Sequence, residues 1–246
     1  MIWCVDAVIA RKLFDYYQRE GEAAHHQKAM YADSSHRKLM MVAQSLLCEA
    51  LKENSVFLDV GCAEGLYTRY AGEKDVLAVG VDISLPKLKR AIAESNMPNI
   101  DYVLASWDRI PLQSSSVDVA LFLEGLEHSL DPKLTMKEVA RVIAEKGTLI
   151  LSAPLWDKKV GRDPFARLFD GHLRSFTVKS LEQIVRRKFR LSREISVLRD
   201  NLYDTGFLSR TLRLLISTKI MARLLELVPS VKERFSAFII IHGKKL

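Results

Sequence analysis

Hydrophobic residues in the middle of the chain form short runs that alternate with stretches of helical periodicity. Short apolar runs predict buried strands over residues 56–60, 76–81, 100–104, 117–123 and 147–152. Between these runs, apolar positions three or four residues apart predict helices over residues 65–71, 85–95 and 131–145. Strands that alternate with helices favour a parallel sheet, so the sequence predicts an α/β fold.

Different patterns flank this alternating region. Helical periodicity covers residues 5–19 and 36–51, with a polar break between them. After Pro154 we expect a turn, then a helix that Thr177 caps. The remaining predicted elements are strands near residues 189–198 and 235–243 and a cationic, amphipathic helix over residues 205–228.

The sequence VFLDVGCAEGLYTRY joins the first predicted strand to a helix through small residues. The strand leads through Asp59 into Gly61, Ala63 and Gly65. Such a turn lets the backbone approach a ligand closely, because glycine has no Cβ and tolerates unusual dihedral angles. About 20 residues later the next strand ends at Asp82, where a carboxylate can accept both hydroxyls of a ribose. The pattern therefore predicts a nucleoside-containing cofactor.

The spacing of the small residues argues against a dinucleotide. The dinucleotide fingerprint G-x-G-x-x-G would place its third glycine where Leu66 stands. Asp59 also precedes the first glycine by two residues, and a carboxylate there repels a pyrophosphate. A ligand that carries positive charge and no phosphate suits this loop better.

The loop resembles the first motif of the class I S-adenosylmethionine-dependent methyltransferases, (D/E)-x-G-x-G-x-G, with Ala63 at the middle glycine. Residues 105–132 resemble the second half of the cofactor site in the type 11 (ubiquinone/menaquinone-biosynthesis-like) family. The resemblance covers about residues 40–195 well and the rest loosely. It implies a Rossmann-like, doubly wound sheet of seven mostly parallel strands in the order 3-2-1-4-5-7-6, the last strand antiparallel, with N-terminal lid helices.

The resemblance also implies where S-adenosylmethionine binds. Ser106 stands where the family has an aspartate that contacts adenine, so we expect a neutral acceptor for the adenine amino group. Cys62 is expected to be a small filler along the cofactor's path and not a nucleophile. The full set of expected cofactor contacts is Asp59, Gly61, Cys62, Ala63, Gly65, Asp82, Ile83, Ser106, Trp107 and Glu124, with Tyr31 and Arg37 from the lid.

Two histidines are candidates for a proton acceptor near the transferred methyl group. His128 follows the fourth predicted strand, at the carboxyl end of the sheet, and His172 lies in a turn that resembles the family's H-x-x-x-F-T. For both, the ordinary alternative is a histidine that only stabilises the local structure, and the sequence does not choose between them. Glu127 is expected to be a surface carboxylate.

The charge is unevenly distributed along what we expect to be a single methyltransferase domain, residues 1–246. Basic and acidic side chains number 7 and 7 in the N-terminal helical lid, residues 1–54, and 10 and 14 in the cofactor-binding core, residues 55–155. The basic C-terminal part, residues 156–246, has 20 and 9, and contains the last two strands and the inserted helix. This excess is either a solvated surface or the footprint of an acidic partner.

Cysteine usage and hydropathy narrow the expected setting. The three cysteines show no C-x-x-C spacing, so the sequence indicates neither a disulfide framework nor a metal site. No apolar run reaches about 18 residues, and the N-terminal stretch lacks the basic start of a secretory signal. We expect a cytoplasmic protein, and the sequence leaves its oligomeric state open.

The methyl acceptor remains open at this point. The leucine- and isoleucine-rich face of residues 205–228 favours a small or lipid-like acceptor, with peripheral membrane contact through this helix. One alternative is a tRNA wobble-uridine-type methyltransferase, because those enzymes share the motif set and the C-terminal third is basic. A nucleic acid acceptor ranks behind a small molecule, because no basic stripe with interleaved aromatic residues is visible. A second alternative is a non-catalytic S-adenosylmethionine-binding protein.

Overall fold

A computed structural model gives the structure of the chain. It describes residues 11, 14–19, 34–155, 173–174, 176–198 and 236–246. The described elements, in chain order, are α3 (Ser34–Ala50), β1 (Val56–Val60), α4 (Leu66–Gly72), β2 (Leu77–Asp82), α5 (Leu85–Ala93), β3 (Ile100–Leu104), β4 (Val117–Phe122), the 3-10 turn η1 (Leu126–His128), α6 (Pro132–Val142), β5 (Ile143–Pro154), α8 (Val178–Val185), β6 (Phe189–Leu198) and β7 (Ser236–Lys245).

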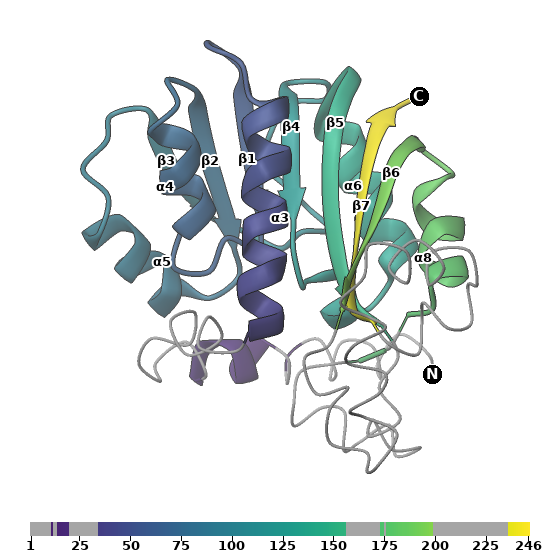
Figure 1. The fold of residues 1–246 in the computed structure, drawn as a ribbon. Coiled ribbons are helices and arrows are strands. Elements are labelled where there is room, and N and C mark those ends of the chain that lie inside the picture. Colours follow the sequence, from purple (N-terminus) through teal and green to yellow (C-terminus); the bar gives the residue numbers. More distant parts are fainter. Residues whose placement is uncertain (1–10, 12–13, 20–33, 156–172, 175, 199–235) are drawn as a thin grey trace.

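These strands form one seven-stranded sheet (Figure 1). Its order is β3-β2-β1-β4-β5-β7-β6. The pairs β2–β3, β1–β2, β1–β4 and β4–β5 are parallel, whereas β7 is antiparallel to both β5 and β6. The predicted fold class and strand order are confirmed. No described helix is both long and apolar enough to cross a membrane.

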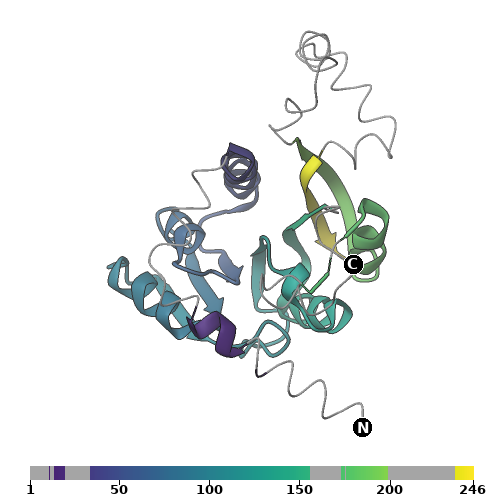
Figure 2. The same cartoon turned by 90° about the horizontal axis from the view of Figure 1, so that it is seen from below.

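Helices cover both faces of the sheet and close two apolar cores (Figure 2). On one face, α3 and α4 pack on the central strands through residues that include Leu47, Tyr67 and Phe57. On the other face, α6 and α8 pack through residues that include Met136 and Leu181. Because both faces of a parallel sheet are buried, its central strands read as nearly continuous apolar runs.

One predicted boundary is wrong. The helix expected over residues 131–145 ends at Val142, and residues 143–146 belong to β5. Ile143 is fully buried and pairs with Val117, and β-branched residues of this kind favour a half-buried strand over a helix. Lys146, with φ at 63°, lies in the same stretch as an irregularity in the β4–β5 register. Tertiary pairing therefore overrides the helical spacing that the sequence shows.

The carboxyl ends of the parallel strands meet at one edge of the sheet, which points downward in Figure 1. Helical residues 14–19 lie against this edge, where Gln18 Nε2 donates to the carbonyl of Ile83 at 2.7 Å. Ser84 Oγ donates to the carbonyl of Tyr17 at 3.0 Å. Ligands of open α/β sheets bind at this edge, so part of the N-terminal region lies beside the predicted site.

The N-cap of α6 generates a stability prediction. Asp131 Oδ1 accepts hydrogen bonds from the backbone N–H groups of Lys133, at 2.9 Å, and Leu134, at 3.2 Å. We expect Asp131→Ala to lower the free energy of unfolding by about 1 kcal/mol in urea titrations, since the variant leaves these donors without a partner. Asp131→Asn keeps an acceptor and should retain most of the stability. An equal loss in both variants would assign the effect to charge beside Arg174 instead.

Candidate functional site

The loop between β1 and α4 adopts left-handed backbone at three positions. Gly61, Ala63 and Gly65 have φ angles of 72°, 49° and 74°. The N–H groups of Gly61 and Cys62 both donate to the carbonyl of Val81, at 2.7 and 3.0 Å, which joins the loop to the end of β2. Ala63 therefore occupies a conformation that favours glycine, and this explains why the related motif has glycine there.

Asp82 at the end of β2 is bound directly to this loop. Its Oδ2 accepts from the N–H of Ala63 and its Oδ1 from the N–H of Ser84, both at 2.8 Å. Each carboxylate oxygen has two lone pairs, so Asp82 retains acceptor capacity for a ligand. The structure thus brings together the two features that the sequence places about 20 residues apart.

A second carboxyl group, Asp59, lies buried behind the loop. Thr68 Oγ1 donates to its Oδ2 at 2.7 Å. Burial, with a smaller contribution from the negative charge of Asp82, raises the pKa of Asp59 to about 7. Burial raises the pKa of Asp82 as well. Two desolvated carboxyl groups therefore face the same loop and stabilise positive charge there.

Cys62 fills the space between the loop and the sheet. Its side chain is buried, and a Cβ at Gly80 would lie 2.8 Å from Cys62 Sγ and 2.9 Å from Thr68 Oγ1. Burial and the nearby Asp59 raise the pKa of the thiol well above its ordinary value. A thiol held neutral in this way is a poor nucleophile, which agrees with the expectation of a small filler.

Glu64 was not singled out by the sequence, although it lies inside the motif. Its side chain is buried, and Arg90 Nε on α5 donates to its Oε1 at 2.9 Å. Its carbonyl accepts from Arg69 on α4 at 2.6 Å. The loop is therefore fastened to two helices. A charged residue at an otherwise small-residue turn is the signal that could have revealed this role.

The expected adenine side of the site is the segment after β3. The N–H of Ala105 donates to the carbonyl of Asp82 at 3.1 Å, so this segment begins beside the end of β2. The half-buried Trp107 packs on Phe122, with ring centroids 5.7 Å apart. Its ring also lies over the loop, 3.6 Å from where a Cβ of residue 61 would be. Ser106 is half-buried beside it.

The carboxyl end of β4 carries a second pair of acidic residues. Glu124 has φ at 48°, and its Oε1 accepts from Ser152 Oγ at 2.6 Å. Burial raises the pKa of Glu124 to about 8, and burial together with Glu124 raises the pKa of Glu127 well above its ordinary value. Both oxygens of Glu127 are buried, and neither has a hydrogen-bond partner among the described residues. The expectation of a surface carboxylate at Glu127 is wrong, because η1 turns this residue inward.

His128 lies next to this acidic pair. Its Nε2 is 3.8 Å from Glu127 Oε1, and its ring packs edge-on against Tyr17 with centroids 5.8 Å apart. The N–H of Leu173 donates to the carbonyl of Glu127 at 3.0 Å, so chain from beyond β5 also reaches this corner. Tyr17 was not predicted as a site residue, because the sequence gives no register between the N-terminal helix and the sheet.

The remaining predicted site residues are Ile83, Arg37, His172 and Tyr31. Ile83 follows Asp82 and accepts the hydrogen bond from Gln18 through its carbonyl. Arg37 is exposed on the first turns of α3. His172 and Tyr31 lie outside the described residues, as do the amphipathic segment 205–228 and part of the predicted N-terminal lid.

Comparison with known proteins shows what this arrangement resembles. Residues 58–151, which include the loop, Asp82, Trp107 and the acidic pair, match the family model described as a methyltransferase domain. This part of the chain is similar to the type 11 methyltransferase domain. S-adenosylmethionine is the cofactor that this similarity implies for the site, and the loop, with its two desolvated carboxyl groups, suits it.

Two curated relatives are similar to part of this chain. The ubiquinone biosynthesis O-methyltransferase of Idiomarina loihiensis is 35% identical over 98 residues, which are 39% of this chain and 40% of the relative. A ubiquinone/menaquinone biosynthesis C-methyltransferase of Campylobacter jejuni is 27% identical over 127 residues, 49% of this chain and 52% of the relative. The chain thus spans about half the length of these relatives or less.

Solved structures share the fold of this chain across most of its length. A chain of the complex between the Haloferax volcanii Trm112 methyltransferase activator and a methyltransferase has a TM-score of 0.66, covers 94% of this chain and 96% of that one, and is 16% identical. An S-adenosylmethionine-dependent methyltransferase of Mesorhizobium loti has a TM-score of 0.56, covers 81% and 96%, and is 18% identical. The [4+2]-cyclase SpnF has a TM-score of 0.60, covers 83% and 80%, and is 16% identical.

The left-handed loop predicts opposite outcomes for two substitutions. A Cβ at Gly65 would lie 2.8 Å from two ring carbons of Tyr102 and closer to its hydroxyl. Gly65→Ala should lower the free energy of unfolding by about 1–2 kcal/mol from backbone strain alone. Ala63→Gly should leave stability unchanged or raise it by up to about 1 kcal/mol, because relief of strain offsets added unfolded-state entropy. Urea unfolding measures both, and a clear loss in Ala63→Gly would contradict the argument.

The acidic pair predicts a pH dependence of stability. In the folded state the pKa of Glu124 is raised to about 8, whereas the ordinary pKa of this group is 4.5. Between these two pH values the folded state binds more protons than the unfolded state. The stability that Glu124 contributes at low pH is therefore lost as the pH rises from 4.5 to about 8. The slope approaches about 1.4 kcal/mol per pH unit for one proton. Urea unfolding at about pH 6 and pH 8 should show a smaller decline in Glu124→Gln than in wild type. Glu73→Gln, on the exposed end of α4, is the matched control, and equal declines in all three would contradict the prediction.

Proposed function

We propose that this chain is an S-adenosylmethionine-dependent methyltransferase that acts on a small or lipid-like acceptor. The observation that carries the proposal is the placement of Asp82 on the N–H groups of Ala63 and Ser84, with the buried Asp59 on the far side of the same loop. Free lone pairs on Asp82 suit ribose hydroxyls. Desolvated carboxyl groups favour the sulfonium and ammonium charges of this cofactor and disfavour a pyrophosphate.

The other proposed contacts surround that anchor. Ser106 and the backbone of Trp107 would hydrogen-bond the adenine, while the indole covers its ring. Glu124, with Ser152 on one oxygen, would stabilise the cationic end of the methionine moiety. Arg37, at the start of α3, is the proposed partner of the methionine carboxylate, as an arginine fork matches a carboxylate. Glycine at position 61 leaves the loop backbone open to the cofactor.

The chemistry asked of the protein is mainly alignment. The methyl group is already activated by the positive sulfur, so the nucleophile, the methyl carbon and the sulfur need to be held in line for displacement. A hydroxyl or acidic carbon acceptor must also lose a proton. We propose His128 as the acceptor of that proton, because it lies beside the acidic pair at the carboxyl end of the sheet, with its Nε2 3.8 Å from Glu127 Oε1.

The acceptor class rests on different support. The two curated relatives are named as ubiquinone or menaquinone biosynthesis methyltransferases. The amphipathic helix that the sequence predicts over residues 205–228, with its arginines and lysine, would shield such an acceptor or contact an anionic membrane. The cyclase neighbour shows that this fold also occurs in a protein named for another reaction, so methyl transfer itself needs a test.

Cofactor binding gives the first test of this function. Calorimetry should show saturable binding of S-adenosylmethionine and S-adenosylhomocysteine, weakened at least tenfold, or about 1.4 kcal/mol, in Asp82→Ala. Asp101→Ala removes an exposed carboxylate from the neighbouring strand β3 and should leave affinity unchanged. Tighter binding of NAD, or equal affinity in Asp82→Ala, would remove the cofactor assignment.

Methyl transfer from labelled cofactor gives the second part of the same test. Incorporation into quinone-precursor, lipid or small-acid fractions is the expected result, with loss in His128→Ala if the acceptor must be deprotonated. Incorporation into purified tRNA alone would overturn the acceptor class. Cofactor binding with no incorporation into any fraction would favour a non-catalytic binding protein.

A further inference from the structure

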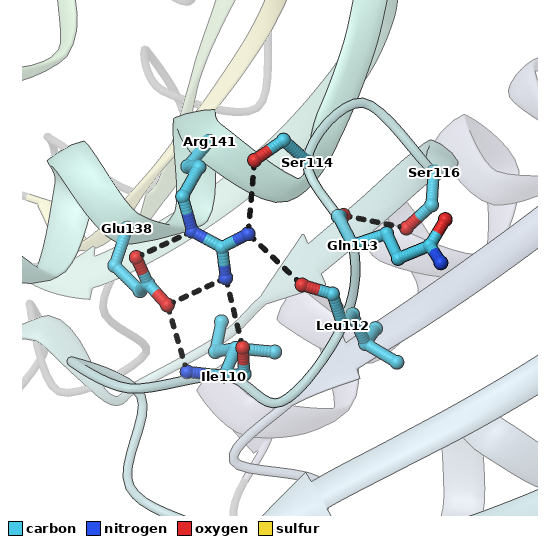
Figure 3. A network of polar contacts seen from close by, with 7 residues as sticks. All are labelled: Ile110, Leu112, Gln113, Ser114, Ser116, Glu138 and Arg141. Atoms are coloured by element: carbon cyan, nitrogen blue, oxygen red, sulfur yellow. Dashed lines mark hydrogen bonds and ion pairs between the residues drawn. The ribbon is translucent and has the colours of Figure 1, made fainter.

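We propose that Glu138 and Arg141 on α6 are positioning residues that set the affinity for S-adenosylmethionine, because they hold the wall formed by Ser106 and Trp107 in its binding position. The inference rests on the proposed function and names residues that neither touch the loop of β1 nor belong to a recognisable catalytic group. They lie one helical turn apart on α6 and face the segment that precedes β4 (Figure 3).

Arg141 uses every one of its N–H groups in this contact. Its Nε and one Nη donate to the two oxygens of Glu138, both at 2.8 Å. The same Nη donates to the carbonyl of Ile110 at 2.8 Å, and the other Nη donates to the carbonyl of Leu112 at 2.9 Å and to Ser114 Oγ at 3.1 Å. A guanidinium has five N–H donors in a fixed fork, so this site satisfies all of them.

Glu138 completes the contact from the opposite side. Its Oε1 accepts from the N–H of Ile110 at 2.9 Å, so both backbone groups of Ile110 are held by the pair. Ile110 is itself buried in the core beneath α6. The carboxylate also orients the guanidinium, and the hydrogen bonds from Arg141 lower the pKa of Glu138.

These contacts fix the far end of the segment that carries the proposed adenine wall. Its near end is fixed where the N–H of Ala105 donates to the carbonyl of Asp82 at 3.1 Å. Between the two ends, the bond from the N–H of Arg109 to the carbonyl of Ser106, at 3.0 Å, is the one backbone hydrogen bond that the described residues place within the turn. Trp107 lies in this span and packs on Phe122, so its position over the loop depends on that contact and on how firmly both ends are held.

The connection to β4 does not depend on the side chain of Arg141, so this residue has a different role from simply attaching that connection to α6. The N–H groups of Ser115 and Ser116 donate to the carbonyls of Arg141 and Val142, both at 2.9 Å, and these bonds do not involve the arginine side chain. The connection to β4 therefore stays attached to α6 when the side chain is removed. A variant without the Arg141 side chain loses the donors to the carbonyls of Ile110 and Leu112. These two residues lie between Trp107 and the attached serines in the chain. A half-exposed ion pair also contributes little to global stability by itself.

The experiment measures affinity for S-adenosylmethionine and S-adenosylhomocysteine by calorimetry, and the position of Trp107 by fluorine NMR. The protein is labelled with 5-fluorotryptophan, and Trp107→Phe assigns the resonance. Arg141→Ala should weaken both ligands about tenfold and shift the resonance of Trp107 in the free protein. Arg141→Lys and Glu138→Gln should show smaller effects in the same direction. The matched control is Arg186→Ala, which removes a helical Arg–Glu pair from α8 and should change neither readout.

A double-mutant cycle separates this inference from its alternatives. In a Trp107→Ala background, Arg141→Ala should cost much less affinity than in wild type, because the wall that it positions is already lost. Fully additive losses, an unshifted Trp107 resonance, or wild-type affinity in folded Arg141→Lys and Arg141→Ala would each overturn the inference. Absence of cofactor binding in the wild-type protein would instead overturn the proposed function. Should Arg141→Ala fail to fold, Arg141→Lys and Glu138→Gln carry the same test.

Discussion

Desolvated carboxyl groups at the carboxyl ends of adjacent strands are the constraint on which this site depends. Asp59, Asp82 and Glu124 end or follow the neighbouring strands β1, β2 and β4, and burial raises the pKa of each. A carboxyl group taken out of water either keeps its proton or gains a positive partner. A positively charged ligand at this edge would therefore favour the ionised form of these groups.

The fold sets the positions of the carboxyl groups, and arginine side chains on nearby helices hold the loop and the proposed adenine wall in place. Parallel strands bring their carboxyl ends to one edge, so Asp59 and Asp82 meet without any local sequence contact. Arg90 then fixes the loop through Glu64, and Arg141 fixes the segment that carries Trp107. In both cases an arginine on a helix binds the site's backbone or its loop carboxylate. Such outer contacts hold binding groups within the small tolerances that recognition requires.

The sequence predicted the fold and the proximity of the glycine loop to Asp82, because both leave local signals. Apolar runs gave the strands, and the glycine loop and Asp82 have fixed spacing within one strand–helix–strand unit. It did not predict the inward turn of Glu127, because the burial of a charged residue after β4 depends on η1 and on chain that arrives from beyond β5. Tyr17 was missed for the same reason. The wrong end of the 131–145 helix likewise reflects sheet pairing, which helical spacing does not encode.

The same reasoning explains why the cofactor is better determined than the acceptor. The residues proposed to meet the cofactor's charges lie on or just after the central strands, whose positions the sheet fixes. The corner proposed to face an acceptor is built from Glu127, His128, Tyr17 and the chain near Leu173, which come from three distant parts of the sequence. The acidic character of this corner adds one restriction: an acceptor that brings a negative charge next to Glu127 requires Glu127 to keep its proton or a cation to compensate the charge, since two unpaired buried anions repel each other strongly.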